Sequence, residues 1–342
     1  MKKSISILLL FAVAATFVSC GSKEAAETTA TSIVLHAERE TVTAEQKPNE
    51  SGIAASGNAE SASWILYNDG ALEITGTGTW NSNPELLANA EKITKVIFSD
   101  GISTIGQAAF AGCENLKEII LPESLLIIEA QAFSGCGIKA LNIGRNVAFI
   151  AADAFDGCEI TDIKISQDNA YYSTDRYGVI FNKAKTELIM FSDGFKMNSY
   201  TVPNTVEKIG EYAFLGNERL VTVDLPESLK EISARAFADC NNLKNINIPS
   251  QLTLIGASSF ENCSSISEIE FSESVQIIGD NAFAGCTDLF EITVPKSVTT
   301  IGNGAFADTV EKVYYDGSEN AWKAVWVGEN AFVNASIIFN EK

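Results

Sequence analysis

Apolar residues recur along this chain with a period of about 23 residues. Eight phenylalanines mark the period, and six of them are followed by a cysteine three residues later. A period of about 20 to 50 residues is the signature of a stacked repeat, so the pattern predicts a solenoid with these side chains in its core. The phenylalanines are Phe110, Phe133, Phe155, Phe214, Phe237, Phe260, Phe283 and Phe306, and the cysteines are Cys113, Cys136, Cys158, Cys240, Cys263 and Cys286.

Each repeat contains two apolar segments before its phenylalanine. Residues 223–225 alternate between apolar and polar, which is typical of a short, half-buried strand. Pro226 ends this strand because proline has no backbone donor, and Pro122, Pro203, Pro249 and Pro295 hold the same place in their repeats. A second apolar pair follows, and then a short helical or tight-turn segment carries Phe237. One such unit cannot bury its apolar side alone, so neighbouring coils must stack.

The period is interrupted once and bounded by two different segments. The interval from Phe155 to Phe214 is 59 residues (214 − 155), and apolar runs at 178–181 and 187–191 predict two strands in a longer variant coil over about 165–200. In residues 57–92, two alternating runs flank Asn68-Asp69-Gly70, which predicts a hairpin and an N-terminal β cap. We therefore expect about nine coils of 22–23 residues over 93–309, followed by a last strand and an aromatic C-terminal cap over 310–342.

The full repeat is nearly intact in residues 220–240 and 289–306, where it approximates L-x-x-I-x-I-P-x-S-[LV]-x-x-I-G-x-x-A-F-x-G-C. This combination resembles the BspA-type leucine-rich repeats of bacterial surface proteins, and the resemblance covers roughly residues 57–340. It implies an α/β leucine-rich-repeat solenoid. It also implies adhesion, in which the protein binds an extracellular or cell-surface protein without catalysis.

The first 56 residues differ in composition from the repeats. Lys2 and Lys3 precede an apolar run over 5–18, which is shorter than the roughly 20 residues that span a bilayer. Residues 1–19 are therefore expected to be a secretory signal peptide. Cys20 resembles the lipidated cysteine of a lipobox, which implies anchoring at the outer membrane and exposure at the cell surface. Residues 20–56 are rich in Ala, Thr, Glu and Ser and predict a flexible tether.

Composition excludes several classes of function. The chain has 44 acidic and 24 basic residues, a formal net charge of −20, so nucleic acid is not an expected partner. Its single histidine, His36, falls in the predicted tether, which leaves no Ser-His-Asp triad or histidine-based zinc site in the fold. A hydrolase that uses carboxylates alone is the remaining enzymatic alternative, but the acids are scattered along an open sheet. We expect a monomeric binding protein without cofactor or metal.

The six repeat cysteines allow three interpretations. Buried free thiols are favoured because stacked equivalents have parallel side chains and because each run holds three cysteines, an odd number for pairing. The same position also accepts Asn217 and Thr309, which indicates a site for any small side chain. Disulfides in an exported protein, or a metal site, are the alternatives.

The candidate binding surface is the solvent side of the strands. Asp224, Glu268, Glu270 and Glu291 concentrate there in the later coils. In a chain this acidic, such a cluster favours a solubilising role; if it is instead a ligand site, it suits basic protein segments or a divalent cation. The aromatic residues Tyr171, Tyr172 and Tyr177 of the variant coil could instead stack on a sugar, which favours glycan capture for a nutrient-uptake system, or pack that coil against its neighbours. A purely structural surface role is a further alternative.

Overall fold

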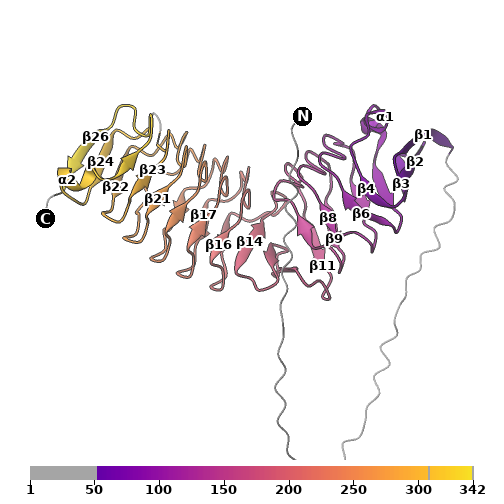
Figure 1. The fold of residues 1–342 in the computed structure, drawn as a ribbon, viewed down its shortest axis with the longest axis horizontal. Coiled ribbons are helices and arrows are strands. Elements are labelled where there is room, and N and C mark those ends of the chain that lie inside the picture. The colour runs from indigo at the N-terminus through magenta and orange to yellow at the C-terminus, as the bar shows by residue number, and fades with distance from the viewer. Residues whose placement is uncertain (1–51, 307–308, 341–342) are drawn as a thin grey trace, which may run out of the picture. The chain divides into compact units, whose positions relative to one another are not determined.

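The computed structural model describes residues 52–306 and 309–340. They form a β-solenoid of about 12 coils that stack in sequence order (Figure 1). The predicted leucine-rich-repeat solenoid is therefore confirmed, and it has more coils than the nine expected because parts of 57–92 and 310–342 also pair as coil strands. The predicted signal peptide, Cys20 and His36 lie outside the described residues. No helix in the described ranges is long and apolar enough to cross a membrane.

Each coil contributes a first strand before the proline position, except that one coil contributes only a bridge at Glu270, and we call the solvent side of these segments the first-strand face. Side chains alternate as predicted, so that Glu118 and Asp162 are exposed while Ile119 and Ile163 are buried. Parallel pairing stops between β7 and β9, between β11 and β15, and between β19 and β22. The first strands are β3 (Ala71–Gly76), β5 (Lys95–Phe98), β7 (Glu118–Ile120), β9 (Ala140–Ile143), β11 (Asp162–Ile165), β15 (Ser199–Thr201), β17 (Thr222–Asp224), β19 (Asn245–Ile246), β22 (Glu291–Val294), β24 (Lys312–Tyr315) and β26 (Ser336–Phe339).

A second strand follows in each coil and forms a second parallel track. This track is interrupted once in the described residues, between β10 and β14. The second strands are β4 (Gly78–Trp80), β6 (Ile102–Ile105), β8 (Ile127–Ile128), β10 (Phe149–Ile150), β14 (Glu187–Met190), β16 (Lys208–Ile209), β18 (Glu231–Ile232), β20 (Leu254–Ile255), β21 (Ile277–Ile278), β23 (Thr300–Ile301) and β25 (Trp326–Val327).

The N-terminal hairpin predicted around Asn68–Gly70 is present. Strand β1 (Ile53–Ala59) pairs antiparallel with β2 (Ala62–Tyr67), and β2 pairs antiparallel with β3. Gly70 has a φ of 86°, which suits the tight turn between β2 and β3. Because β3 pairs in parallel with β5, the hairpin extends the first-strand sheet of the coils.

The segment that carries each phenylalanine is a tight turn rather than a helix. In most of these turns the positions two residues before and two residues after the phenylalanine both have positive φ, as at Arg235 (54°) and Asp239 (60°) around Phe237, whereas in the turn of Phe155 only Gly157 does. A right-handed helix cannot continue through such residues. The described helices are accordingly few and short: α1 (Pro84–Leu87), the 3-10 helix η1 (Ala90–Lys92) and α2 (Glu319–Trp322).

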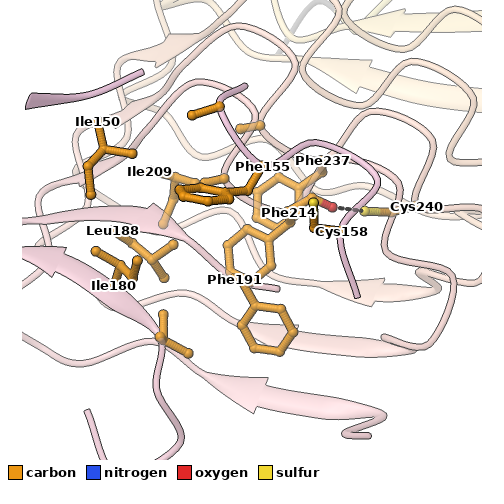
Figure 2. Packing of buried hydrophobic residues seen from close by; sticks show 14 of the residues in the cluster. Ile150, Phe155, Cys158, Ile180, Leu188, Phe191, Ile209, Phe214, Phe237 and Cys240 are labelled. Atoms are coloured by element: carbon orange, nitrogen blue, oxygen red, sulfur yellow. Dashed lines mark hydrogen bonds between the residues drawn. The ribbon is translucent and has the colours of Figure 1, made fainter. Parts of the chain in front are cut away.

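The phenylalanine rings stack through the core from coil to coil. Phe237, for example, lies between Phe214 and Phe260, with ring centroids 4.7 and 5.2 Å apart. The rings of Phe214 and Phe237 can be seen in Figure 2. The stack includes two rings that the period did not single out: Phe191 stacks on Phe214 at 5.0 Å, and Phe332 stacks on Phe306 at 5.2 Å. Phe191 belongs to the variant coil that the sequence predicts over about 165–200, and Phe332 belongs to the segment that the sequence predicts as the C-terminal cap.

The variant coil contains the two predicted strands and one more. Strand β13 (Ile180–Asn182) pairs antiparallel with β14, which confirms the strands expected at 178–181 and 187–191. A third strand, β12 (Tyr172–Thr174), pairs antiparallel with β13. Strand β14 then pairs in parallel with β16 and restarts the second-strand track.

All six repeat cysteines are buried and unbridged. Five of them donate a hydrogen bond from the thiol to the carbonyl of the preceding coil's phenylalanine, as Cys240 does to Phe214 at 3.0 Å (Figure 2). Burial raises the pKa of the Cys113 thiol to about 11 and that of Cys286 to about 12. The thiols therefore join neighbouring coils and stay protonated.

Candidate functional site: a groove on the first-strand face

The first-strand face is hollowed beside β17 and β19 into a groove of about 660 Å³. Three of the four acidic residues predicted from the sequence line it, namely Asp224, Glu268 and Glu270. The other lining residues are Thr222, Val223, Lys244, Asn245, Ile246, Asn247, Ile248 and Ser267. The groove therefore spans three successive coils.

The groove forms where the first-strand ladder is interrupted. In the preceding coils the ladder is regular: Val221 N–H donates to Asn198 C=O at 2.8 Å, and Lys244 N–H donates to Val221 C=O at 2.9 Å. The next coil breaks this series, since no backbone bond from Ser267 or Glu268 to Lys244 exists in the part of the chain that the structure describes. Its first strand pairs only through a single bridge on its other side, from Glu270 to Thr293.

The side chain of Asn247 accounts for the end of β19. Its Oδ1 accepts from Leu225 N–H at 2.7 Å, and its Nδ2 donates to Leu225 C=O at 2.8 Å. A side-chain amide thus takes the place of a strand's backbone amide, and β19 ends at Ile246. Ile246 and Ile248 are only partly buried, whereas Val223 is 1% exposed in the coil before. These two isoleucines give the groove an apolar floor.

The rim of the groove carries a net negative charge. Asp224 accepts from the Thr201 hydroxyl at 3.1 Å, while Glu268 and Glu270 are exposed and form no ion pair within the described ranges. Lys244 is the single basic residue in the lining, against three carboxylates. The groove therefore combines an apolar floor with acidic walls, a surface that can hold a cationic, partly aliphatic ligand.

Glu291, the fourth acidic residue of the predicted set, does not line the groove. It pairs with Lys312, and its Oε2 lies 3.5 Å from the Tyr314 hydroxyl. The structure therefore divides the predicted acidic set into three unneutralised carboxylates at the groove and one ion-paired carboxylate beyond it.

The predicted aromatic residues of the variant coil also divide. Tyr171 and Tyr177 are exposed, whereas Tyr172 is buried and its hydroxyl accepts from Ile150 N–H at 2.9 Å. The Arg176 guanidinium lies 4.6 Å from the centroid of the Tyr177 ring, and the Tyr200 ring contacts that ring edge-on at 6.3 Å. Two tyrosines are thus available to a ligand, and one holds the coil to its neighbour.

Sequence reasoning missed the floor of the groove. Ile246 and Ile248 occupy the same inward positions as the buried residues of other coils, so the pattern predicts them to be buried too. The one available signal is the amide at position 247, and it does not single out this coil because Asn142 holds the same place in an earlier one. Among the described residues, no group of three His, Cys, Asp or Glu side chains could hold a metal ion.

Comparisons with known proteins agree with this architecture. A family model for the BspA type leucine rich repeat region matches residues 83–178 and 186–311 with six copies. The pneumococcal vaccine antigen PcpA matches with a TM-score of 0.63 at 15% identity, over 85% of this chain and 95% of that one. A leucine-rich cell-surface protein of Faecalibacterium prausnitzii matches with a TM-score of 0.51 at 22% identity, over 80% and 97%. No curated protein sequence matches the chain.

Proposed function

The chain belongs to the BspA-type leucine-rich-repeat family, and we propose that it is a non-catalytic cell-surface protein that binds another protein through its first-strand face. The observation that carries this proposal is the groove beside β19, where apolar side chains and unneutralised carboxylates are exposed together. A regular coil buries its apolar residues and pairs its backbone groups, so it offers a partner far less to bind.

The groove favours a basic, extended segment of a partner protein. The aliphatic stems of lysine or arginine side chains can lie on Ile246 and Ile248 while their charged ends reach the carboxylates. Charge complementarity of this kind speeds association and excludes acidic partners, and it weakens as salt screens the charges. We therefore expect salt-sensitive binding.

Binding to extracellular-matrix proteins and to a lysine-rich peptide, measured at low and high salt, tests the proposal. We expect the triple variant Asp224→Asn, Glu268→Gln, Glu270→Gln to lose binding at least tenfold, about 1.4 kcal/mol, with an unchanged thermal midpoint. The matched control is a second triple variant on the same face outside the groove, Glu118→Gln, Asp162→Asn, Glu291→Gln. Equal losses in the two triples would mean that diffuse charge attracts the partner, and undiminished binding in the first would remove the groove from the site.

A second candidate function is glycan capture at the variant coil. It is favoured by the exposed rings of Tyr171 and Tyr177, on which sugars can stack. Binding of a soluble oligosaccharide that is insensitive to salt, that is lost in Tyr177→Ala and that is retained in the groove triple would select this function. Binding with the opposite pattern would select protein recognition.

We also propose that the protein is anchored at the outer membrane through a lipid on Cys20, as a monomer whose tether over 20–56 holds the solenoid away from the membrane. In cells of the native host, Cys20→Ser should release the chain from the membrane fraction. A lipid label supplied to the cells should enter the wild type alone. A Cys20→Ser chain that stays in the membrane would refute lipid anchoring at this residue.

A further inference from the structure

Every continuous feature of the solenoid is interrupted at the variant coil. The first-strand track stops between β11 and β15, and the second-strand track stops between β10 and β14. The ring stack also stops: Phe155 stacks on Phe133 at 5.4 Å, and the next stacked pair in the described residues is that of Phe191 with Phe214. No other level of the described solenoid combines the three interruptions.

The turns at this level also lack their backbone ladder. Elsewhere the phenylalanine N–H donates to the next coil, as Phe133 does to Ala154 C=O and Phe191 does to Ala213 C=O, at 2.8 and 2.7 Å. Within the described ranges no such bond joins Phe155 or Gly157 to the turn over 190–194. The contact between the turn over 153–157 and the turn over 190–194, which we call the junction, therefore rests on other groups.

Side chains hold the two coils together near the junction. The Ser192 hydroxyl donates to Ile160 C=O at 2.7 Å, and the Asn169 amide donates to Gly144 and Val147 C=O at 2.8 and 2.9 Å. The Tyr172 hydroxyl accepts a hydrogen bond from Ile150 N–H, at the edge of β10 that has no described strand beside it. At this level a few side-chain hydrogen bonds replace the two strand tracks and the backbone hydrogen bonds between turns. The solenoid is therefore expected to open at the junction before it opens elsewhere.

A small cavity at the junction brings carboxylates together. Its volume is about 30 Å³, room for about one water, and Asp153, Asp156 and Asp193 are among its lining residues. Asp193 Oδ1 is shielded from solvent and has no hydrogen-bond partner among the residues that the structure describes. Asn217, which is fully buried in the following coil, has an Nδ2 that is likewise without a partner.

The charges around Asp193 are mostly of its own sign. Burial and, after it, the charge of Asp156 raise the pKa of the Asp193 carboxyl to about 7, although the Asn217 amide acts in the opposite direction. Burial also raises the pKa of Asp156. The charged groups that act on these two carboxyls or on their immediate neighbours are Asp153, Glu159, Glu218, Asp239 and the two bases Lys139 and Arg219. Lys139 is itself bonded to Glu159 at 2.8 Å.

We propose that the junction is a pH-dependent joint between the coils before and after the variant coil, which closes when Asp193 is protonated and opens when Asp193 is ionised beside Asp156. When Asp193 carries its proton, the two carboxyls share the cavity without repulsion. When it loses the proton, two negative charges face each other in a poorly hydrated space, and separation of the turns lets water reach both. The joint would change how the two parts of the first-strand face are presented. This inference does not depend on the proposed binding function.

Hydrogen exchange of the full chain, followed by mass spectrometry and corrected for intrinsic rates, tests the joint. If the carboxyl has its ordinary pKa near 3.8 when the junction is open, the opening constant rises about tenfold from about pH 6 to about pH 8. This increase in opening should appear as a loss of protection from exchange in peptides covering 149–159 and 187–217. Peptides from the outer coils should show no such loss. In Asp193→Asn the same peptides should be protected equally at both pH values.

Two further variants keep the test decisive. Asp156→Asn removes the facing charge but keeps the titrating group, so it should reduce the pH effect even if Asp193→Asn folds poorly. Asp168→Asn removes an exposed carboxylate of the same long coil and should behave as the wild type does. The joint is refuted if wild type and Asp193→Asn show the same pH profile, or if the wild type loses protection evenly along the whole solenoid.

Discussion

Removal of one ring from the phenylalanine stack should cost far more in the middle of the solenoid than at its end. Phe237 is 0% exposed and has a stacked ring on each side. Phe332 is only partly buried, stacks on Phe306 alone and has a tilted contact with Trp322 at 6.5 Å. The two positions therefore share chemistry but differ in the number of coils that each ring joins.

The expected magnitudes follow from these contacts. Replacing a buried phenylalanine with alanine costs about 3–5 kcal/mol, and each stacked pair contributes about 0.5–1.5 kcal/mol of such a total. Phe237→Ala loses full burial and two pairs, so we expect about 4–5 kcal/mol. Phe332→Ala loses partial burial and one stacked pair, so we expect about 2 kcal/mol. The conservative variant Phe237→Leu, which keeps most of the volume, should cost less than about 1.5 kcal/mol.

Urea unfolding followed by far-ultraviolet circular dichroism measures these differences. All variants should share the wild-type slope with urea, so that the midpoints report stability directly. Equal costs for Phe237→Ala and Phe332→Ala would refute the reasoning, because the loss would then belong to the side chain itself and not to the stacking of coils. A cost below about 1.5 kcal/mol for Phe237→Ala would refute it as well.

Four further predictions test the thiols, the groove and the junction. The six repeat thiols should fail to react with an aromatic disulfide reagent in the native protein at neutral pH and should all react in denaturant. Cys240→Ser, which keeps a donor to Phe214, should cost less stability than Cys240→Ala in the same urea assay. Asn247→Ala removes the side chain that bonds the backbone N–H and C=O of Leu225. It should lower the free energy of unfolding by about 1–3 kcal/mol and change binding at the groove. Because the Asp193 pKa is raised from 3.8 to about 7, the folded state keeps a proton that the unfolded state loses. Stability should therefore fall by at most about 4 kcal/mol as pH rises from about 4 to about 7, and Asp193→Asn should remove this part of the slope in thermal melts.

The repeat could be predicted from the sequence because its periodic residues each do one physical task. The phenylalanine fills the core, the proline ends the first strand, and the small cysteine position closes the turn. The hairpin at Asn68–Gly70 and the strands on either side of 182–186 were predictable for a similar reason, since turn residues lie between alternating apolar runs. Short-range chemistry is sufficient for these features.

The form of the turn and the number of coils were harder to predict. Positive φ occurs at ordinary residues such as Ala108, Gln131 and Arg235, where stacking on the next coil compensates the local strain, so composition alone does not distinguish the turn from a helix. Trp80 lies on the second-strand track beside Ile105, and its ring stacks on Phe110 at 6.5 Å, so a search for phenylalanine does not find that coil. Both results depend on neighbours that are remote in the sequence.

The candidate site was predicted only in its charges. Asp224, Glu268 and Glu270 are visible as outward carboxylates, but their juxtaposition across a gap follows from the side chain of Asn247, which bonds Leu225 in the previous coil. No periodic pattern predicts that choice, because an outward asparagine would ordinarily point to solvent. The separation of Glu291 from the set likewise depends on its pairing with Lys312.

The two regions of interest in this solenoid both lie where the repeat fails, and there is a physical reason for this. An ideal coil gives every backbone group a partner and buries every inward side chain, so a ligand or a conformational change gains little there. At β19 the ladder lacks its partner, and Ile246 becomes accessible between carboxylates. At the variant coil both strand tracks and the ring stack are interrupted, and the Asp193 carboxylate lies in a poorly hydrated cavity where other coils have backbone hydrogen bonds. The groove and the joint lie in different coils, so variants of one should leave the other unchanged. A groove variant that altered exchange at the junction would show that the coils between them transmit strain.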